Sequence, residues 1–132
     1  MGRRAPVRST GTQPRVLLIE DNALIGLDLG DAFAHAGYRV AGPVATLAEA
    51  AAQVERRTPD LAVVDVRLKD GLCTELAREL HRRGVPFLVH SACRQDSSLC
   101  SELLEAPWLA KPAWSPDVVA AVQDLGRTGA RP

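Results

Sequence analysis

Short runs of consecutive apolar residues alternate along the chain with longer segments in which apolar residues recur every three or four positions. The runs are Val16–Ile19, Leu61–Val64, Phe87–Val89 and Trp108–Ala110, and a more polar run covers Tyr38–Ala41. Uninterrupted apolar runs of this length are typical of strands buried on both faces of a sheet. The more polar run predicts a strand nearer an edge of the sheet.

The longer segments predict five helices, because their apolar residues fall on one face and their ends carry capping residues. Asp21 or Asn22 could cap the first helix, and Gly37 would end it. Thr46 begins a capping box, and Ser115 precedes a proline at the first turn of the last helix. The apolar stripe of the third helix is expected to comprise Leu72, Cys73, Leu76, Ala77 and Leu80, after a turn at Lys69, Asp70 and Gly71. The fourth segment, Asp96–Glu105, predicts a weaker and shorter helix.

Five strands that alternate with five helices predict an α/β fold. Right-handed crossovers between the strands would build a five-stranded parallel sheet with helices on both faces. We place this domain at residues 15–126, with a flexible N-terminal tail at residues 1–14 and a C-terminal tail at residues 127–132.

Composition narrows the classes of protein to which the chain could belong. The 132 residues include 46% hydrophobic residues, 16 basic and 16 acidic side chains, which is typical of one soluble domain. A pI near 6.8 argues against nucleic-acid binding through a strongly basic face. No apolar run approaches the roughly 18 residues of a membrane span, and the N-terminus lacks the apolar core of a signal peptide. With three cysteines and no CxxC pair, we expect a cytoplasmic domain whose thiols are reduced and serve packing.

Polar residues stand where the predicted strands end. Glu20 and Asp21 follow the first strand, Asp65 follows the third, Ser91 the fourth and Lys111 the fifth. The carboxyl ends of parallel strands share one edge of the sheet, so these side chains are expected to meet there. Clustered carboxylates call for a cation, and Mg²⁺, which prefers oxygen ligands, fits them better than zinc. Asp65 could remain a ligand or also attack a phosphoryl group and become an aspartyl phosphate.

This set of residues resembles the receiver domain of two-component response regulators. The match rests on Glu20-Asp21, Asp65, Ser91-Ala92 and Lys111-Pro112 in order, each at a strand end. The resemblance implies a (βα)5 flavodoxin-like receiver fold over residues 15–126. It also implies a stand-alone, single-domain regulator, since few residues fall outside that range.

The resemblance further implies a role for each matching position at the metal site. Asp65 would be the phosphoacceptor. Mg²⁺ would be held by Asp21, by Asp65 and by the backbone carbonyl of Arg67, with Glu20 acting through a bound water.

Three more positions would serve catalysis and switching. Lys111 would pair with the phosphoryl group, and Ser91 would move toward it. Trp108 occupies the place where the family usually has a tyrosine or phenylalanine that rotates inward, although packing explains a tryptophan there equally well.

The implied function is that of a phosphoacceptor in a phosphorelay. The expected partners are a sensor histidine kinase or phosphotransfer protein and a downstream protein target, with no DNA-binding domain, no membrane association and a homodimer left open. No enzymatic activity is expected beyond the domain's own aspartyl phosphorylation and dephosphorylation.

Other functions fit the residues less well. The sequence contains no GxSxG, GxGxxG or GxxxxGK[ST] motif, which argues against a serine hydrolase and a nucleotide-binding module. Asp65-Val66-Arg67 lacks the second aspartate with which an aspartate-based phosphatase performs acid catalysis. The remaining alternative is an adaptor with the receiver fold that binds partners regardless of phosphorylation.

Overall fold

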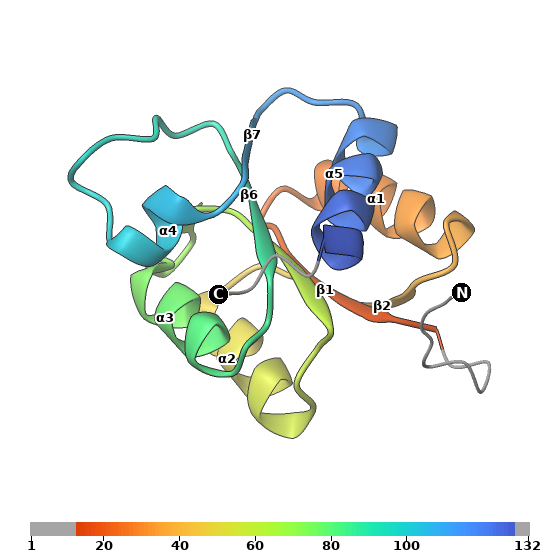
Figure 1. The fold of residues 1–132 in the computed structure, drawn as a ribbon, viewed down its shortest axis with the longest axis horizontal. Helices are drawn as coiled ribbons and strands as arrows, with labels where there is room; N and C mark the ends of the chain where they lie inside the picture. The colour runs from red at the N-terminus through yellow and green to blue at the C-terminus, as the bar shows by residue number, and fades with distance from the viewer. Residues whose placement is uncertain (1–12, 129–132) are drawn as a thin grey trace.

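The computed structural model describes residues 13–128, so most of the two predicted tails lies outside the described residues. One sheet of parallel strands forms the centre of the molecule (Figure 1). Its members are β1 (Arg15–Ile19), β2 (Arg39–Val44), β3 (Leu61–Val64), β6 (Phe87–Ser91) and β7 (Trp108–Ala110). They lie in the order β2-β1-β3-β6-β7, which places the more polar β2 at an edge as predicted.

Helices cover both faces of this sheet. They are α1 (Ala23–His35), α2 (Leu47–Arg56), α3 (Thr74–Arg82), α4 (Ser101–Glu105) and α5 (Ser115–Thr128). Figure 1 shows α1 and α5 together on one face and α2, α3 and α4 on the other. The predicted α/β fold with a five-stranded parallel sheet is therefore confirmed, and α5 continues past the predicted boundary at residue 126. Within residues 13–128, no helix combines the length and the apolarity that a membrane crossing needs.

The alternation of side chains along each central strand divides the core into two layers. Leu17 and Ile19 of β1 pack with residues of α2, α3 and α4, whereas Val16 and Leu18 pack with residues of α1 and α5. All four side chains are buried, which explains why these four positions of β1 are apolar. Burial of each such side chain stabilises the fold by about 1.5–3 kcal/mol.

The predicted helix caps are formed by side chains next to the sheet edge. Asn22, rather than Asp21, caps α1, because its Oδ1 accepts a hydrogen bond of 3.0 Å from the backbone N–H of Ile25. Asp21 is thereby left available for another role. Thr46 caps α2 as predicted, since its Oγ1 accepts from the backbone N–H of Glu49 at 3.1 Å.

The segment after β3 differs from the prediction. Strands β4 (Arg67–Leu68) and β5 (Gly71–Leu72) pair antiparallel as a small ribbon that turns at Lys69 and Asp70. Leu72 therefore belongs to a strand, and it is 44% exposed. The prediction that Leu72 lies on the buried stripe of the third helix is wrong, because α3 begins only at Thr74.

The predicted fourth helix is present only in its last turn. The chain from 92 to 100 forms bends and turns, and helix α4 begins at Ser101 rather than at Asp96. The Asp96 carboxylate accepts a hydrogen bond of 2.9 Å from the backbone N–H of Ser98, so it closes a local turn instead of starting a helix. The expectation of a weak, short helix is confirmed, and the start at Asp96 is wrong.

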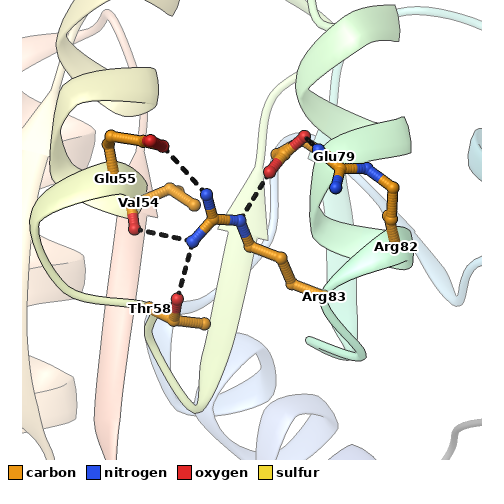
Figure 2. Close-up of polar contacts among 6 residues, drawn as sticks. All are labelled: Val54, Glu55, Thr58, Glu79, Arg82 and Arg83. Atoms are coloured by element: carbon orange, nitrogen blue, oxygen red, sulfur yellow. Dashed lines mark hydrogen bonds and ion pairs between the residues drawn. The ribbon is translucent and has the colours of Figure 1, made fainter.

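Arg83 joins the C-terminal end of α2 to that of α3 (Figure 2). Its guanidinium donates to the backbone carbonyl of Val54 at 3.2 Å and to Thr58 Oγ1 at 2.9 Å. It also pairs with Glu55 at 2.9 Å and with Glu79 of α3, the helix that it follows. A planar guanidinium can serve all these acceptors at once, which an ammonium cannot. This contact holds the C-terminal ends of the two helices together.

Candidate functional site

Three carboxylates meet at the carboxyl ends of β1 and β3. Ile19 of β1 pairs with Val64 of β3, so the residues that follow each of them lie side by side. Glu20 is 4% exposed and Asp65 is 6% exposed, while Asp21 is half-buried. One oxygen from each of the three carboxylates lies within 4.8 Å of the others. Such a group of oxygen atoms is suited to a hard divalent cation.

Lys111 brings a positive charge to two of these carboxylates. It follows β7, and its backbone N–H donates to the Ser91 carbonyl at 3.0 Å, which extends the pairing of the last two strands. Its Nζ donates to Glu20 Oε2 at 2.8 Å and to Asp65 Oδ2 at 2.9 Å. Burial opposes the ammonium, but the hydrogen bonds to the two carboxylates outweigh it, so the pKa of Lys111 is raised. The side chain is therefore protonated at neutral pH.

Ser91 completes the polar contacts of Asp65. It is fully buried at the end of β6, and its Oγ donates to Asp65 Oδ1 at 2.8 Å. The same hydroxyl oxygen accepts from the backbone N–H of Cys93 at 3.2 Å. Both oxygens of Asp65 are thus engaged, one by a hydroxyl and the other by an ammonium. A negative charge that develops on Asp65 or on a group bonded to it would be stabilised from two sides.

Glu20 is held differently from its neighbour Asp21. Besides Lys111, its Oε2 accepts from the backbone N–H of Asn22 at 3.1 Å. Burial raises the pKa of Glu20, while the bonds from Lys111 and Asn22 oppose this shift. Glu20 therefore fixes the lysine and the start of α1, and Asp21 lies half-buried beside it.

The two remaining predicted residues lie at the margins of the carboxylate group. Arg67 is exposed in the ribbon that follows Asp65, where it pairs with Leu72. Trp108 is half-buried at the start of β7, pairs with Val89 and packs against the core layer on the side of α2, α3 and α4. This position fits a packing role, and a switching role for Trp108 stays a prediction.

Asp70, in the ribbon that follows Asp65, makes a contact that sequence reasoning missed. Its carboxylate oxygens accept from the backbone N–H groups of Leu47 at 2.7 Å and Ala48 at 3.2 Å, so it binds the first turn of α2. The bond from Leu47 is the main reason why the pKa of Asp70 is lowered. This contact tethers the ribbon that follows Asp65. The separation of Leu47 and Asp70 in the sequence left no signal that could have revealed it.

His90 lies in the strand next to Ser91 and is buried. It is 2% exposed, and neither ring nitrogen has a hydrogen-bond partner among the described residues. Side chains along a strand point alternately to the two core layers. His90 therefore points to the same face as Leu88, which packs with α1 and α5. Burial first, and then the charge of Lys111, lower the pKa of His90. The imidazole is therefore neutral in the folded protein at neutral pH.

Replacing His90 with leucine is expected to stabilise the protein by about 1–3 kcal/mol at neutral pH, because two unpaired polar atoms leave the core. The lowered pKa of His90 also means that the unfolded chain binds a proton more readily than the folded protein. The free energy of unfolding of the wild type should thus fall as the pH drops below about 6.5. The same drop in pH should lower the free energy of unfolding of the His90→Leu variant by less. Urea unfolding at several pH values measures both effects. His81→Leu, on an exposed position of α3, serves as the control, and an equal acid loss in wild type and His90→Leu would contradict the assignment.

Comparisons with known proteins agree with this geometry. The family model described as "Response regulator receiver domain" matches residues 16–123. The chain is 32% identical over 115 residues to the "Transcriptional regulatory protein PdtaR" of Mycobacterium tuberculosis, covering 83% of this chain and 55% of that protein. It is 31% identical over 117 residues to the "DNA-binding transcriptional activator DevR/DosR" of the same organism, covering 85% and 54%. The chain therefore spans about half the length of the curated relatives it matches.

Solved structures show the same fold. A CheY-like response regulator receiver domain protein from Methanospirillum hungatei superimposes with a TM-score of 0.78 at 23% identity, covering 89% of this chain and 97% of that one. The non-phosphorylated HemR receiver domain from Leptospira biflexa gives a TM-score of 0.74 at 29% identity, covering 86% and 94%. The predicted (βα)5 flavodoxin-like arrangement is thus confirmed. From the matching model over most of its length, and from relatives above 30% identity, the chain belongs to the response regulator receiver domain family.

Proposed function

We propose that Asp65 accepts a phosphoryl group and that the modified domain is then recognised by a protein partner. The observation that carries the proposal is the pair of contacts made by Asp65, whose oxygens bind the Ser91 hydroxyl and the Lys111 ammonium. A carboxylate oxygen between these donors can attack phosphorus and form an acyl phosphate, while the bond from phosphorus to its donor breaks and the leaving group departs. The donor would be a phosphohistidine of a sensor kinase or phosphotransfer protein, which places the domain in the cytoplasm.

The proposal includes Mg²⁺ as cofactor. Asp21, Asp65 and the backbone carbonyl of Arg67 would hold the ion, and Glu20 would act through a bound water. The neighbouring carboxylate oxygens of Glu20, Asp21 and Asp65 are the support, since they match the preference of Mg²⁺ for oxygen ligands. A bound Mg²⁺ neutralises charge on the phosphoryl oxygens. Lys111 already forms ion pairs with the carboxylates of Glu20 and Asp65, so the carboxylate of Asp21 is the most accessible to such an ion.

Phosphorylation would alter the contacts at both oxygens of Asp65. The phosphoryl group replaces one negative charge with about two and adds acceptor oxygens, to which Ser91 and Lys111 can donate. Since the Ser91 hydroxyl also accepts from the Cys93 backbone, its movement would pull on the loop after β6. Switching a domain from mostly off to mostly on takes roughly 5 kcal/mol of differential stabilisation, which a few charge-assisted hydrogen bonds can supply.

A phosphodonor protein has to reach Asp65 from the carboxyl edge of the sheet. Two leucines of α1, which starts beside Asp21, point into solvent: Leu24 is 79% exposed and Leu27 is 63% exposed. Trp114 is 77% exposed in the loop before α5, the helix that packs against α1. Exposed large apolar side chains around a polar site favour protein docking. We propose that the phosphodonor docks on Leu24, Leu27 and Trp114.

The double variant Leu24→Ser, Leu27→Ser is expected to slow phosphotransfer from a protein donor at least tenfold, because docking residues often contribute about 2 kcal/mol each. Phosphorylation by acetyl phosphate should stay unchanged. Quantifying the acyl phosphate formed from each donor tests both statements, with Ala51→Ser on the exposed side of α2 as the control. If phosphorylation slows equally with the protein donor and with acetyl phosphate, the substitutions have disturbed the phosphorylation site and not the docking surface.

Incubation with Mg²⁺ and acetyl phosphate, followed by intact mass measurement, tests the proposed function directly. We expect a gain of one phosphoryl group that requires Mg²⁺ and disappears in EDTA. An unchanged mass in the presence of Mg²⁺ would contradict the proposal and favour an adaptor that binds partners without phosphorylation. Loss of the gain in Asp21→Asn, with recovery at high Mg²⁺, would support the assigned metal position.

A further inference from the structure

All three cysteines of the chain belong to, or pack against, the core layer on the side of α2, α3 and α4. Cys73 is fully buried directly before α3, and Cys100 is half-buried directly before α4. Cys93 lies between them in the sequence, two residues after Ser91. Cys93 and Cys100 both pack against the core layer that contains Cys73. Three thiols from separate segments are thus gathered in one neighbourhood.

The helices that follow Cys73 and Cys100 are packed together. Arg78 of α3 pairs with Glu102 of α4 at 3.7 Å, and Leu76 and Leu103 belong to one core layer. Each cysteine occupies the cap position of its helix, and neither side chain forms a capping hydrogen bond. The two cysteines therefore stand at the starts of adjacent helices without acting as side-chain caps, and the Cys100 thiol bonds to the Glu102 carboxylate.

Cys73 is unreactive by itself. Its backbone N–H donates to the Val66 carbonyl at 2.9 Å, which fixes it in the core. Burial raises the pKa of Cys73 to about 12, and negative charge on Cys100 and on Asp65 adds to this shift ahead of that on Cys93. A buried thiol with so high a pKa does not react with an oxidant directly. Cys100, which is half-buried and directly precedes the helix that packs against α3, is the candidate for the initial reaction.

The thiols do not form a preformed metal site. Within residues 13–128, the group of potential ligands close enough to share one ion comprises Glu20, Asp21 and Asp65, and it contains no cysteine. Disulfide formation between two of the thiols therefore fits this group of cysteines better than metal binding does.

We propose that Cys100 and Cys73 form a reversible disulfide when the protein meets a peroxide. The Cys100 thiol releases its proton and attacks a peroxide oxygen, the O–O bond breaks, and the departing hydroxide takes up that proton, so that a sulfenic acid and one water form. The Cys73 sulfur then attacks the Cys100 sulfur, the S–S bond forms, and the hydroxyl leaves as a second water with the Cys73 proton. Two thiols are oxidised and one peroxide is reduced to two waters.

The disulfide would restrain the loop between β6 and α4. This loop spans 92–100, so a bond at Cys100 fixes its far end to α3, while the Cys93 backbone holds its near end to Ser91. Movement of Ser91 toward a phosphoryl group would then be hindered. This coupling, though not the disulfide itself, rests on the proposed function, and we expect oxidation to slow phosphorylation roughly tenfold.

Mass spectrometry tests the disulfide independently of phosphorylation. The reduced full chain is treated with hydrogen peroxide, free thiols are alkylated, and the peptides are mapped without reduction. We expect loss of two hydrogens, a peptide pair joined through Cys73 and Cys100, and reversal by dithiothreitol. Cys93→Ser should form the same bond, and Cys100→Ser should not. A bond between Cys93 and Cys100, or overoxidation of Cys100 beside a free Cys73, would overturn the proposal.

The coupling is tested in Cys93→Ser, where a single pair of thiols remains. Its reduced and oxidised forms are incubated with Mg²⁺ and acetyl phosphate, and the acyl phosphate is followed over time. Slower phosphorylation of the oxidised form that dithiothreitol restores supports the coupling, and equal rates refute it. If the reduced form is not phosphorylated either, the proposed function is refuted. The peptide map tests the disulfide independently of that result.

Discussion

Replacing Asp65 with asparagine is expected to abolish the mass gain of one phosphoryl group from acetyl phosphate. Asparagine keeps the size of the side chain and can still accept from the Ser91 hydroxyl, but its amide has no anionic oxygen to attack phosphorus. The loss should exceed a hundredfold in the amount of acyl phosphate, as is usual when a nucleophile is removed. Intact mass measurement over a time course gives the result.

The control for this variant is Asp124→Asn, on the exposed surface of α5. It removes a carboxylate of the same kind without touching the site, so phosphorylation should proceed at the wild-type rate. An undiminished mass gain in Asp65→Asn would show that another residue is modified, and the role assigned to Asp65 would be wrong.

Replacing Lys111 with methionine is expected to destabilise the protein by about 3 kcal/mol at neutral pH, because buried carboxylates lose their partner. Nζ of Lys111 bridges Glu20 and Asp65, which are both buried. Burial already raises the pKa of Glu20, and without the ammonium nothing from Lys111 opposes this shift. The contribution of Glu20 to stability is then complete below its unfolded pKa, near 4, and is lost as the pH rises through the folded pKa. The variant should therefore regain stability toward acid pH, as measured by urea unfolding.

Lys69→Met provides the matched control, because the only other lysine of the chain is exposed in the turn between β4 and β5. It should change neither stability nor its pH dependence. Added Mg²⁺ should restore part of the stability of Lys111→Met, since a cation at the same carboxylates offsets their repulsion. A variant as stable as the wild type at neutral pH would refute the view that Lys111 neutralises Glu20 and Asp65.

Much of the fold followed from local patterns. Leu61–Val64 is a short apolar run and became the buried strand β3, while Thr46 provided the cap of α2. The order of residues also placed Asp65 and Lys111 at one edge, because parallel strands bring their carboxyl ends together. The start of α4 was missed, because the Asp96 side chain closes a turn that resembles a helix cap in sequence.

Pairing between one segment and another could not be anticipated in the same way. Leu72 has the spacing of a helical stripe, yet it joins Arg67 and Leu68 in a ribbon. The Asp70 carboxylate binds the start of α2 across a long stretch of sequence. Each of these contacts depends on the position of a partner that no local pattern specifies.

The sequence by itself determined the alternation of strands and helices and the residues that stand at the strand ends. These features arise from the repeat of side chains along single segments and from the chemistry of caps, which both act over a few residues. Only the tertiary structure decided that Ser91 and Lys111 bind opposite oxygens of Asp65, that His90 is buried without a partner, and that the three thiols share one neighbourhood. The reason is physical, because burial and hydrogen-bond partners are set by the packing of segments far apart in the chain.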